Sequence, residues 1–188
     1  MSEEIKPEEI RDAYLKADLL FDEREVQSAI QRMAYDISMD LAEENPIFVP
    51  VMNGGLVVGG QLLTRLNFPL QQDYIHATRY RNTTSGHELE WKTYPNLNFK
   101  GRTVLVVDDI YDEGHTLAAV VEYFRNGGAK KVLVAVLLDK QHDRKPHSNL
   151  KADYIGLEIE DRYVFGFGLD YKGYWRNAPG IFAISSTP

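Results

Sequence analysis

Apolar residues recur every three or four positions in the N-terminal part of this chain, the spacing that predicts amphipathic helices. We predict a first helix over residues 8–20, with one apolar side formed by Ile10, Tyr14 and Leu15. A second helix is predicted to begin after Asp22, because Asp22 and Glu25 have the spacing of a capping box. Its core-facing stripe contains Val26, Ile30, Met33, Ile37 and Leu41.

Continuous apolar runs further along the chain predict strands that are buried on both faces. These runs occupy residues 47–52, 104–107 and 132–138. A glycine-containing turn and an apolar helix over 56–66 follow the first run, and an acidic turn and another helical pattern follow the second. This alternation predicts an α/β fold with a central, mostly parallel sheet flanked by helices.

Less regular segments connect and follow these units. We predict two strands, over residues 71–80 and 90–94, joined by the polar, glycine-containing stretch 81–89. Together these segments are expected to form a long hairpin with a mobile tip. Residues 141–151 are polar and predict a loop, in which we expect His142 and His147 to be solvated rather than metal-bound. The segment 152–177 alternates apolar runs with glycine and predicts a pair of strands with an aromatic face.

The acidic turn carries most of the candidate chemistry. Four carboxylates, those of Asp108, Asp109, Asp112 and Glu113, lie within six positions at the end of the 104–107 run. Like charges this close disfavour joint ionisation unless hydroxyls, N–H groups or a cation satisfy them. A sugar diol with a magnesium-bound phosphate ester would do so, and a turn that enters a helix offers N–H groups to phosphate. A single Asp here would be explained by helix capping, but capping does not require clustered charge.

Composition narrows the class of protein. With 188 residues, 44% of them hydrophobic and 26% charged, one globular domain is expected. A net charge of −7 argues against a nucleic-acid binder, and the lack of cysteine excludes disulfides and thiolate zinc sites. No signal-peptide pattern and no apolar stretch of membrane-spanning length is present, so we expect no membrane association and a cytoplasmic location.

The string VLVVDDIYDEGHT at residues 104–116 resembles the phosphoribosyl pyrophosphate signature of type I phosphoribosyltransferases. The segment 152–177 is similar to the base-binding end of hypoxanthine-guanine phosphoribosyltransferases. This resemblance implies the type I fold as a single domain over 1–188. A small hood would be formed by about 1–20 and 153–188, and a hairpin lid by about 79–95. It also implies a homodimer or homotetramer.

The resemblance further implies purine salvage. The 5-phosphoribosyl group of phosphoribosyl pyrophosphate would pass to hypoxanthine or guanine, giving IMP or GMP and pyrophosphate. Asp108 and Asp109 would hold the ribose hydroxyls. The phosphate would be bound by Asp112, Glu113, Gly114, His115 and Thr116. We expect Asp112, which lies between the diol and the phosphate, to take the proton from the base as the catalytic residue.

The remaining site residues come from other segments. Pyrophosphate would be bound by Met52, Asn53, Gly54, Arg79 and Arg176, with a cis peptide between Met52 and Asn53. The base would be bound by Lys140, Tyr163, Val164 and Asp170: Lys140 reaches the six-position oxygen and Tyr163 stacks on the ring. Mg²⁺ would be held by Asp170, Asp108 and Asp109. The chain departs from the common pattern at Asn53, where many relatives carry a basic residue, and at Glu113 and His115.

Other functions remain open from the sequence. A related transferase could take xanthine, adenine or a pyrimidine, although Lys140 and the Tyr163–Val164 pair favour 6-oxopurines. A regulator on the same fold could bind RNA or nucleotide without catalysis, but the acidic charge and the intact 104–116 string argue against it. A receiver domain also uses paired acids, but near its first strand.

Overall fold

The computed structural model describes residues 6–79, 89–146 and 150–185 of the protein. The helices are α1 (Pro7–Leu15), α2 (Glu23–Leu41), α3 (Gly55–Leu63) and α4 (His115–Asn126). The strands of the large sheet are β2 (Ile47–Met52), β3 (Gln71–Gln72), β4 (Ile75–Arg79), β5 (Leu89–Thr93), β6 (Thr103–Tyr111), β7 (Lys131–Lys140) and β8 (Tyr154–Ile159). A small second sheet contains β1 (Asp18–Phe21), β9 (Val164–Phe165) and β10 (Ile181–Ala183).

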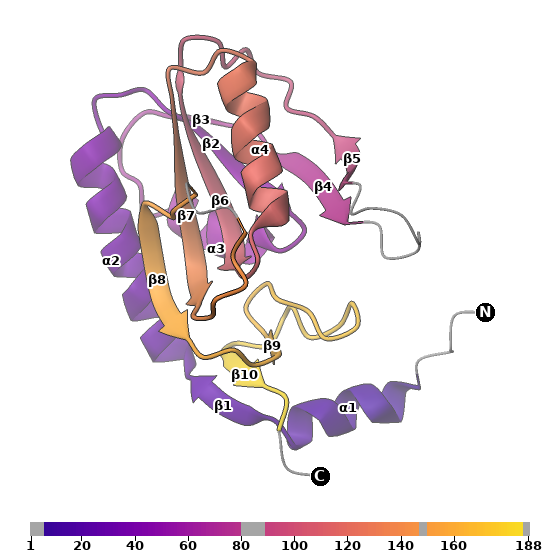
Figure 1. Ribbon diagram of the computed structural model, residues 1–188. Coiled ribbons are helices and arrows are strands. Elements are labelled where there is room, and N and C mark those ends of the chain that lie inside the picture. The colour runs from indigo at the N-terminus through magenta and orange to yellow at the C-terminus, as the bar shows by residue number, and fades with distance from the viewer. Residues whose placement is uncertain (1–5, 80–88, 147–149, 186–188) are drawn as a thin grey trace.

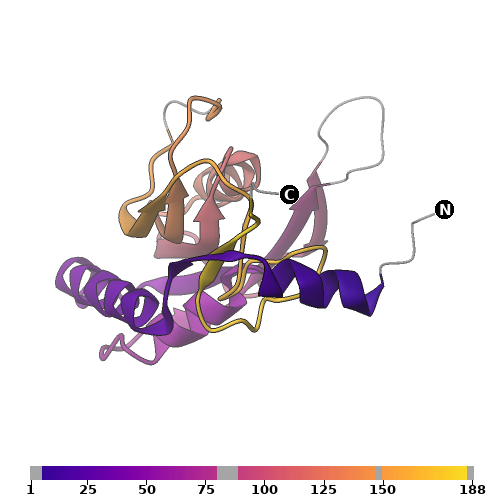
Figure 2. The same cartoon turned by 90° about the horizontal axis from the view of Figure 1, so that it is seen from below.

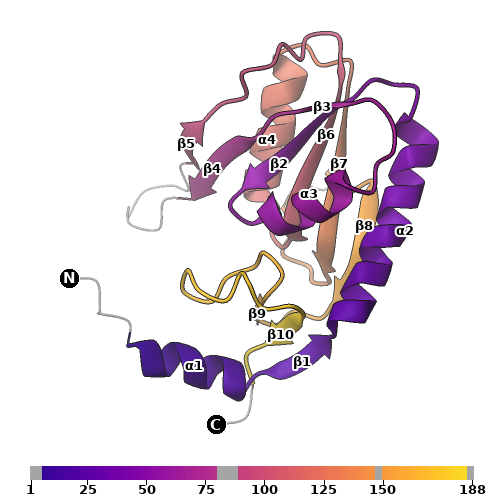
Figure 3. The same cartoon turned by 180° about the vertical axis from the view of Figure 1, so that it is seen from behind.

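The large sheet has the strand order β5-β4-β2-β6-β7-β8, with β3 paired to β2. Strands β2, β4, β6, β7 and β8 run parallel to one another, and β5 runs antiparallel to β4 at the edge of the sheet. Figures 1 and 3 show α4 covering one face and α2 and α3 the other. The two buried cores divide in the same way, one under α2 and α3 and the other under α4. The predicted parallel α/β sheet is confirmed.

The second helix follows the sequence pattern closely. Asp22 accepts a hydrogen bond from the Glu25 backbone N–H, and the Glu25 side chain accepts one from the Asp22 N–H, both at 2.9 Å. The five predicted stripe residues, Val26, Ile30, Met33, Ile37 and Leu41, are each at most 1% exposed. Local capping and helical periodicity are therefore enough to position α2.

The first predicted helix is wrong in its C-terminal half. Helix α1 ends at Leu15, and Asp18–Phe21 forms β1, which pairs with β10 at the far end of the chain. Leu15 is 78% exposed, so only part of the predicted apolar side is buried. A strand partner more than 150 residues away decides this segment, which local periodicity cannot reveal.

The last segment differs from the predicted strand pair. β8 extends the large sheet beside β7, whereas β9 lies in the small sheet between β10 and the ends of the large strands. The chain thus leaves the large sheet after Ile159 and enters the small sheet at β9. Figure 2 shows α1 and the segment after β8 lying across the end of the large sheet.

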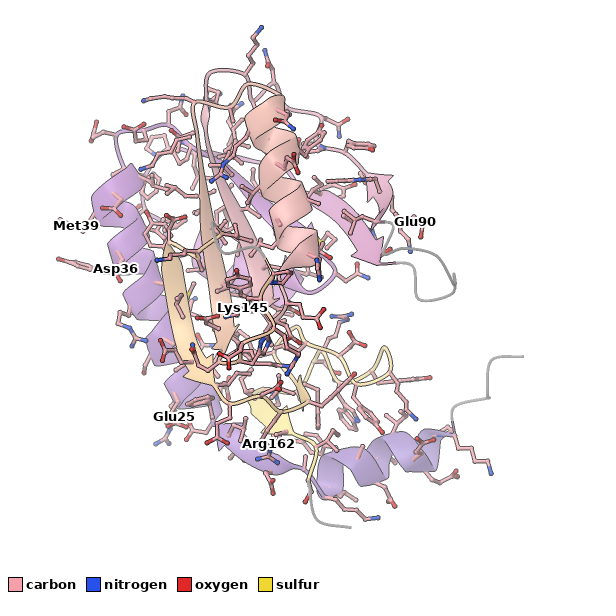
Figure 4. The ribbon with its side chains drawn as sticks, in the orientation of Figure 1. Glu25, Asp36, Met39, Glu90, Lys145 and Arg162 are labelled. Carbon is pink, nitrogen blue, oxygen red and sulfur yellow. The ribbon has the colours of Figure 1, made fainter. Side chains whose placement is uncertain are left out.

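Aromatic contacts join helix α1 to the C-terminal part of the hood. The Tyr14 and Trp175 rings stack at 4.5 Å, and the Trp175 indole N–H donates to the Ile10 carbonyl at 2.6 Å. Arg162 donates to Asp18 and to the Ile184 carbonyl, joining β1 to the C-terminal strand (Figure 4). These bonds hold the hood segments together.

The predicted strand over 71–80 is interrupted at Asp73. This residue is 8% exposed and accepts hydrogen bonds from the N–H groups of Asn96 and Leu97 at 2.6 and 2.8 Å. The chain therefore forms β3 and β4 as separate strands, and β4 pairs with β5 as the predicted hairpin. The predicted tip of the lid, 81–89, falls almost wholly outside the described residues.

Among the described residues, no helix combines the length and apolar character needed to cross a bilayer.

Candidate active site

The candidate site lies at the ends of β6 and β7 that face the hood (Figure 1). β6 is longer than the apolar run predicted: Asp108, Ile110 and Tyr111 still pair with Val136, Leu138 and Asp139 of β7. The paired acids therefore belong to the strand and not to a turn after it. Their positions are fixed by the ladder, and they lie at the edge of the sheet where α/β proteins bind ligands.

Asp108 and Asp109 form a crowded acidic pair. Burial raises the pKa of Asp108 well above its usual value, and the neighbouring charge of Asp109 adds to this. Burial also raises the pKa of Asp109, although a hydrogen bond with Asp108 and the charge of Arg176 oppose the shift. A ligand with hydroxyl donors or a cation would relieve both.

Arg176 joins the hood to this acidic pair. One guanidinium nitrogen donates to Asp170 Oδ1 at 2.6 Å, and the other lies 4.0 Å from Asp109 Oδ2 and donates to the Gly168 carbonyl at 2.5 Å. The Gly173 N–H donates to the second Asp170 oxygen at 2.7 Å. Two predicted site residues of the C-terminal segment, Asp170 and Arg176, are thus brought to the end of β6.

The turn after β2 packs directly against the same acids. The peptide between Met52 and Asn53 is cis, as predicted. A Cβ atom on Gly54 would lie 2.2 Å from Asp109 Oδ2, and one on Gly168 would lie 2.6 Å from the Gly54 carbonyl oxygen. Gly54 is therefore the meeting point of the β2 turn, the end of β6 and the hood, and only glycine fits there.

Gly114 shapes the start of α4. It has φ +79°, and a Cβ atom there would lie 2.1 Å from the Tyr111 ring. Helix α4 begins at the next residue, so its first-turn N–H groups have no partner within the helix and suit an anion. Glu113 and His115 flank Gly114, and their side chains approach to 3.6 Å. Thr116, half-buried, follows in the first turn.

Asp112 has a different partner on each carboxylate oxygen. Lys140 Nζ donates to Oδ2 at 2.9 Å, and His142 Nε2 lies 2.7 Å from Oδ1. Burial acts to raise the pKa of Asp112, but the hydrogen bonds from Lys140 and His142 outweigh it, and the pKa is lowered. Asp112 is accordingly held as a carboxylate, the form required of a proton acceptor.

The expectation that His142 is solvated is wrong. Its side chain is only 4% exposed, because the 141–146 loop folds back onto Asp112. His147 lies outside the described residues. No local pattern in the sequence predicts this contact, because His142 and Asp112 are 30 positions apart. They meet because β6 and β7 end side by side.

Tyr163 and Val164 lie at the edge of the hood. Tyr163 is 51% exposed and its hydroxyl donates to the Asp170 carbonyl at 3.3 Å. Val164 is 6% exposed and pairs with Ala183 in the small sheet. Tyr163 is therefore linked through Asp170 and Arg176 to the acids of β6, and an exposed aromatic face lies beside the site.

Comparisons with known proteins agree with this arrangement. A family model described as "Phosphoribosyl transferase domain" matches residues 17–172. A hypoxanthine-guanine phosphoribosyltransferase of Bacillus subtilis is 32% identical over 164 residues, which make up 87% of this chain and 90% of that protein. The chain belongs to the phosphoribosyltransferase family.

Two further relatives extend the comparison of this phosphoribosyltransferase. A hypoxanthine-guanine-xanthine phosphoribosyltransferase of Tritrichomonas foetus is 31% identical over 163 residues, which make up 87% of this chain and 88% of that protein. The structure of hypoxanthine phosphoribosyltransferase from Trypanosoma cruzi in complex with the product IMP has a TM-score of 0.81 at 26% identity. It covers 91% of this chain and 96% of that one. The predicted type I phosphoribosyltransferase fold is confirmed.

The fit of the phosphoribosyltransferase site to Mg²⁺ follows from its oxygen donors. In the described part of the chain, no three His, Cys, Asp or Glu side chains form a ready metal cluster. Mg²⁺ is commonly held by one or two carboxylates together with substrate phosphates and water, so such a cluster is not required. Asp109 and Asp170, which approach Arg176 from opposite segments, offer suitable oxygens. The side chain of Arg79, at the end of β4, lies outside the described residues.

Proposed function

We propose that this phosphoribosyltransferase acts in purine salvage. It transfers the 5-phosphoribosyl group of phosphoribosyl pyrophosphate to hypoxanthine or guanine, producing IMP or GMP and pyrophosphate. The observation that carries this proposal is the ion pair between the buried Lys140 side chain and the partly exposed Asp112 carboxylate, which meet at 2.9 Å. A 6-oxopurine presents its six-position oxygen and N7 on the same edge. A cation and a proton acceptor side by side match that edge.

The base is held between three segments. Lys140 donates to the six-position oxygen, which selects an acceptor and disfavours the amino group of adenine. Tyr163 stacks on the ring, and the Val164 backbone meets its edge. Asp170 completes this side of the site. The half-exposed Tyr163 ring and the buried Lys140 side chain support these roles.

The sugar phosphate is held at the end of β6. Asp108 and Asp109 bind the ribose hydroxyls, which relieve the pair of like charges. The segment from Asp112 through Glu113, Gly114 and His115 to Thr116 holds the 5′-phosphate with backbone N–H groups and the Thr116 hydroxyl.

The leaving group is held by the β2 turn and the hood. The residues proposed to bind pyrophosphate are Met52, Asn53, Gly54, Arg79 and Arg176. Mg²⁺, bound by Asp170, Asp108 and Asp109, would neutralise and orient the pyrophosphate. Asp112 accepts the proton of the base as the sugar is transferred.

A panel of bases tests the proposal. Purified protein is incubated with phosphoribosyl pyrophosphate, Mg²⁺ and hypoxanthine, guanine, xanthine, adenine or uracil, and nucleotide products are separated by chromatography. We expect IMP and GMP, with no product from adenine or uracil. Transfer to adenine or uracil alone, or RNA binding without any transfer, would overturn the proposal.

A further inference from the structure

We infer that His142 is a positioning residue for Asp112, keeping one carboxylate oxygen occupied so that the other one faces the base. The inference rests on the proposed function, because it assigns Asp112 the role of proton acceptor. His142 lies on the loop after β7, outside the phosphoribosyl signature.

The two oxygens of Asp112 are held unequally. His142 Nε2 contacts Oδ1 at 2.7 Å and Lys140 Nζ contacts Oδ2 at 2.9 Å. The His142 side chain is 4% exposed, whereas Asp112 is 42% exposed. The imidazole therefore lies on the inner side of the carboxylate, and the carboxylate keeps an accessible side for a substrate.

The second ring nitrogen fixes the tautomer of His142. The backbone N–H of Arg144 donates to His142 Nδ1 at 3.1 Å, so Nδ1 acts as an acceptor and carries no proton. The proton of the imidazole then lies on Nε2, which donates it to Asp112 Oδ1. His142 is thus arranged as a hydrogen-bond donor to the carboxylate.

The loop that carries His142 is tied to the hood side of the site. Arg144 donates to both carboxylate oxygens of Asp161 at 2.5 and 2.9 Å, and the Gln141 N–H donates to the Ile159 carbonyl at 2.8 Å. Lys145 pairs with Asp139 of β7 beside the strand ends, where Figure 4 labels it. These bonds keep the imidazole in place when a substrate enters.

Lys140 and His142 respond differently to a base. The six-position oxygen of the purine offers Lys140 a new acceptor, so Lys140 shifts from Asp112 Oδ2 to the base. In the tautomer of the base that carries its proton on N7, this edge offers His142 no acceptor in place of Asp112. Oδ2 is therefore freed while Oδ1 stays bound.

The freed oxygen then takes the proton. A ring nitrogen forms the bond to C1′ while the C1′–O bond to pyrophosphate breaks, and pyrophosphate leaves with the electron pair. The proton on the base passes to Asp112 Oδ2 and afterwards to solvent. His142 fixes the carboxylate plane for this transfer without touching the substrate.

Several charged groups surround the carboxylate and shape its titration. Lys140 approaches from β7 and His142 from the loop, and the charges of Asp112 and Glu113 both act on Arg144. Asp161 neutralises Arg144 through their paired hydrogen bonds. The His142 hydrogen bond lowers the pKa of Asp112, so its loss raises that pKa, while the Lys140 bond limits the rise.

Three variants test the role by kinetics. His142→Leu removes the donor, His142→Gln offers an amide N–H at the reach of Nε2, and Asp143→Asn, at an exposed position of the same loop, is the matched control.

We expect His142→Leu to lower kcat about tenfold, as for one lost hydrogen bond to a charged group. The acid limb of the kcat profile should move to higher pH, with KM for phosphoribosyl pyrophosphate and IMP affinity within about twofold of wild type. His142→Gln should recover most of kcat. An unchanged kcat and acid limb in His142→Leu, or equal losses of kcat and IMP affinity, would overturn the inference.

A second measurement does not depend on activity. ¹⁵N shifts of the His142 ring in the wild-type protein should show a protonated Nε2 and an unprotonated Nδ1, and Asp112→Asn should change the Nε2 signal. A protonated Nδ1 with a free Nε2 would contradict the inference even if the protein transfers phosphoribosyl groups. Failure of all bases in the panel would instead contradict the proposed function and leave this measurement to decide the pairing.

Discussion

The Nζ atom of Lys140 lies 2.9 Å from Oδ2 of Asp112, although the two residues are 28 positions apart in the sequence. They meet because β6 and β7 are parallel neighbours, so that the residues which follow β6 face the last residue of β7. The residue proposed to select the base and the residue proposed to accept its proton are therefore in direct contact. Substitution of Lys140 should therefore change the ionisation of Asp112.

Asp112→Asn should lower turnover far more than nucleotide binding. The amide keeps the shape of the side chain but cannot accept the proton, so we expect kcat to fall by about 10²–10⁴. IMP affinity, measured by calorimetry, should change only slightly. Equal losses in kcat and in IMP affinity would show that Asp112 binds and does not act as the base.

Lys140→Gln should weaken use of the base and shift the pH dependence. Removing the cation forfeits about 1.5–3 kcal/mol of charge-assisted hydrogen bonding, a loss of about 10–150-fold in kcat/KM for hypoxanthine. The Lys140 bond lowers the pKa of Asp112, so its loss raises that pKa. Because Asp112 must be ionised to accept a proton, the acid limb of kcat should move to higher pH.

The matched control for this variant is Lys130→Gln. Lys130 pairs with Glu44 near the start of β7, at the opposite end of the strand from Lys140. Its rate and pH profile should equal those of wild type. An acid limb that stays in place in Lys140→Gln would contradict the coupling.

Gly54→Ala should damage the candidate site. Its Cβ atom would lie 2.2 Å from Asp109 Oδ2 and must displace that carboxylate or the β2 turn. A displacement of about 1 Å at such a position can cost about a hundredfold in rate, so we expect this loss in kcat/KM for phosphoribosyl pyrophosphate.

Gly60→Ala serves as the control for Gly54→Ala. Gly60 lies inside α3, and a Cβ atom there meets nothing within 4 Å. Activity should be unchanged, and thermal unfolding should show a gain of about 0.5–1 kcal/mol from the better helix former. Full activity in Gly54→Ala would mean that Asp109 can move without consequence.

Asp108→Asn should stabilise the ligand-free protein while reducing activity. Burial, together with the charge of Asp109, holds the pKa of Asp108 well above its usual value, so the native state disfavours the ionised carboxylate. This penalty grows as the pH rises from the usual value through the native one, and it is absent at low pH. Tm should therefore rise in the variant at pH 8 and converge with wild type near pH 4. Each kcal/mol gained corresponds to about 2–4 °C.

Asp36→Asn provides the comparison for the Asp108 variant. Asp36 lies exposed on α2 (Figure 4), so its Tm should stay near that of wild type at both pH values. A fall in Tm of Asp108→Asn at pH 8, measured without Mg²⁺ and phosphoribosyl pyrophosphate, would contradict the assigned electrostatic cost.

The predicted elements that proved accurate depend on close neighbours in the sequence. The α2 capping box joins Asp22 to Glu25, three residues away, and the cis peptide that the family resemblance implied joins Met52 to the next residue. The acidic string from Asp108 to Thr116 was also recognisable, because its chemistry is contained in one short segment.

Only the tertiary structure decided which distant segments meet. Asp18–Phe21 is a strand because β10 lies beside it, and β8 and β9 separate into two sheets because the chain crosses from the large sheet to the hood. The contacts of Arg176 with Asp109 and of His142 with Asp112 likewise join segments that are far apart in the sequence. The sequence determined the helical and strand periodicities and the identity of the reactive groups, since both are local properties. The pairing of carboxylates with their donors depends on strand order and loop path, which no local pattern encodes.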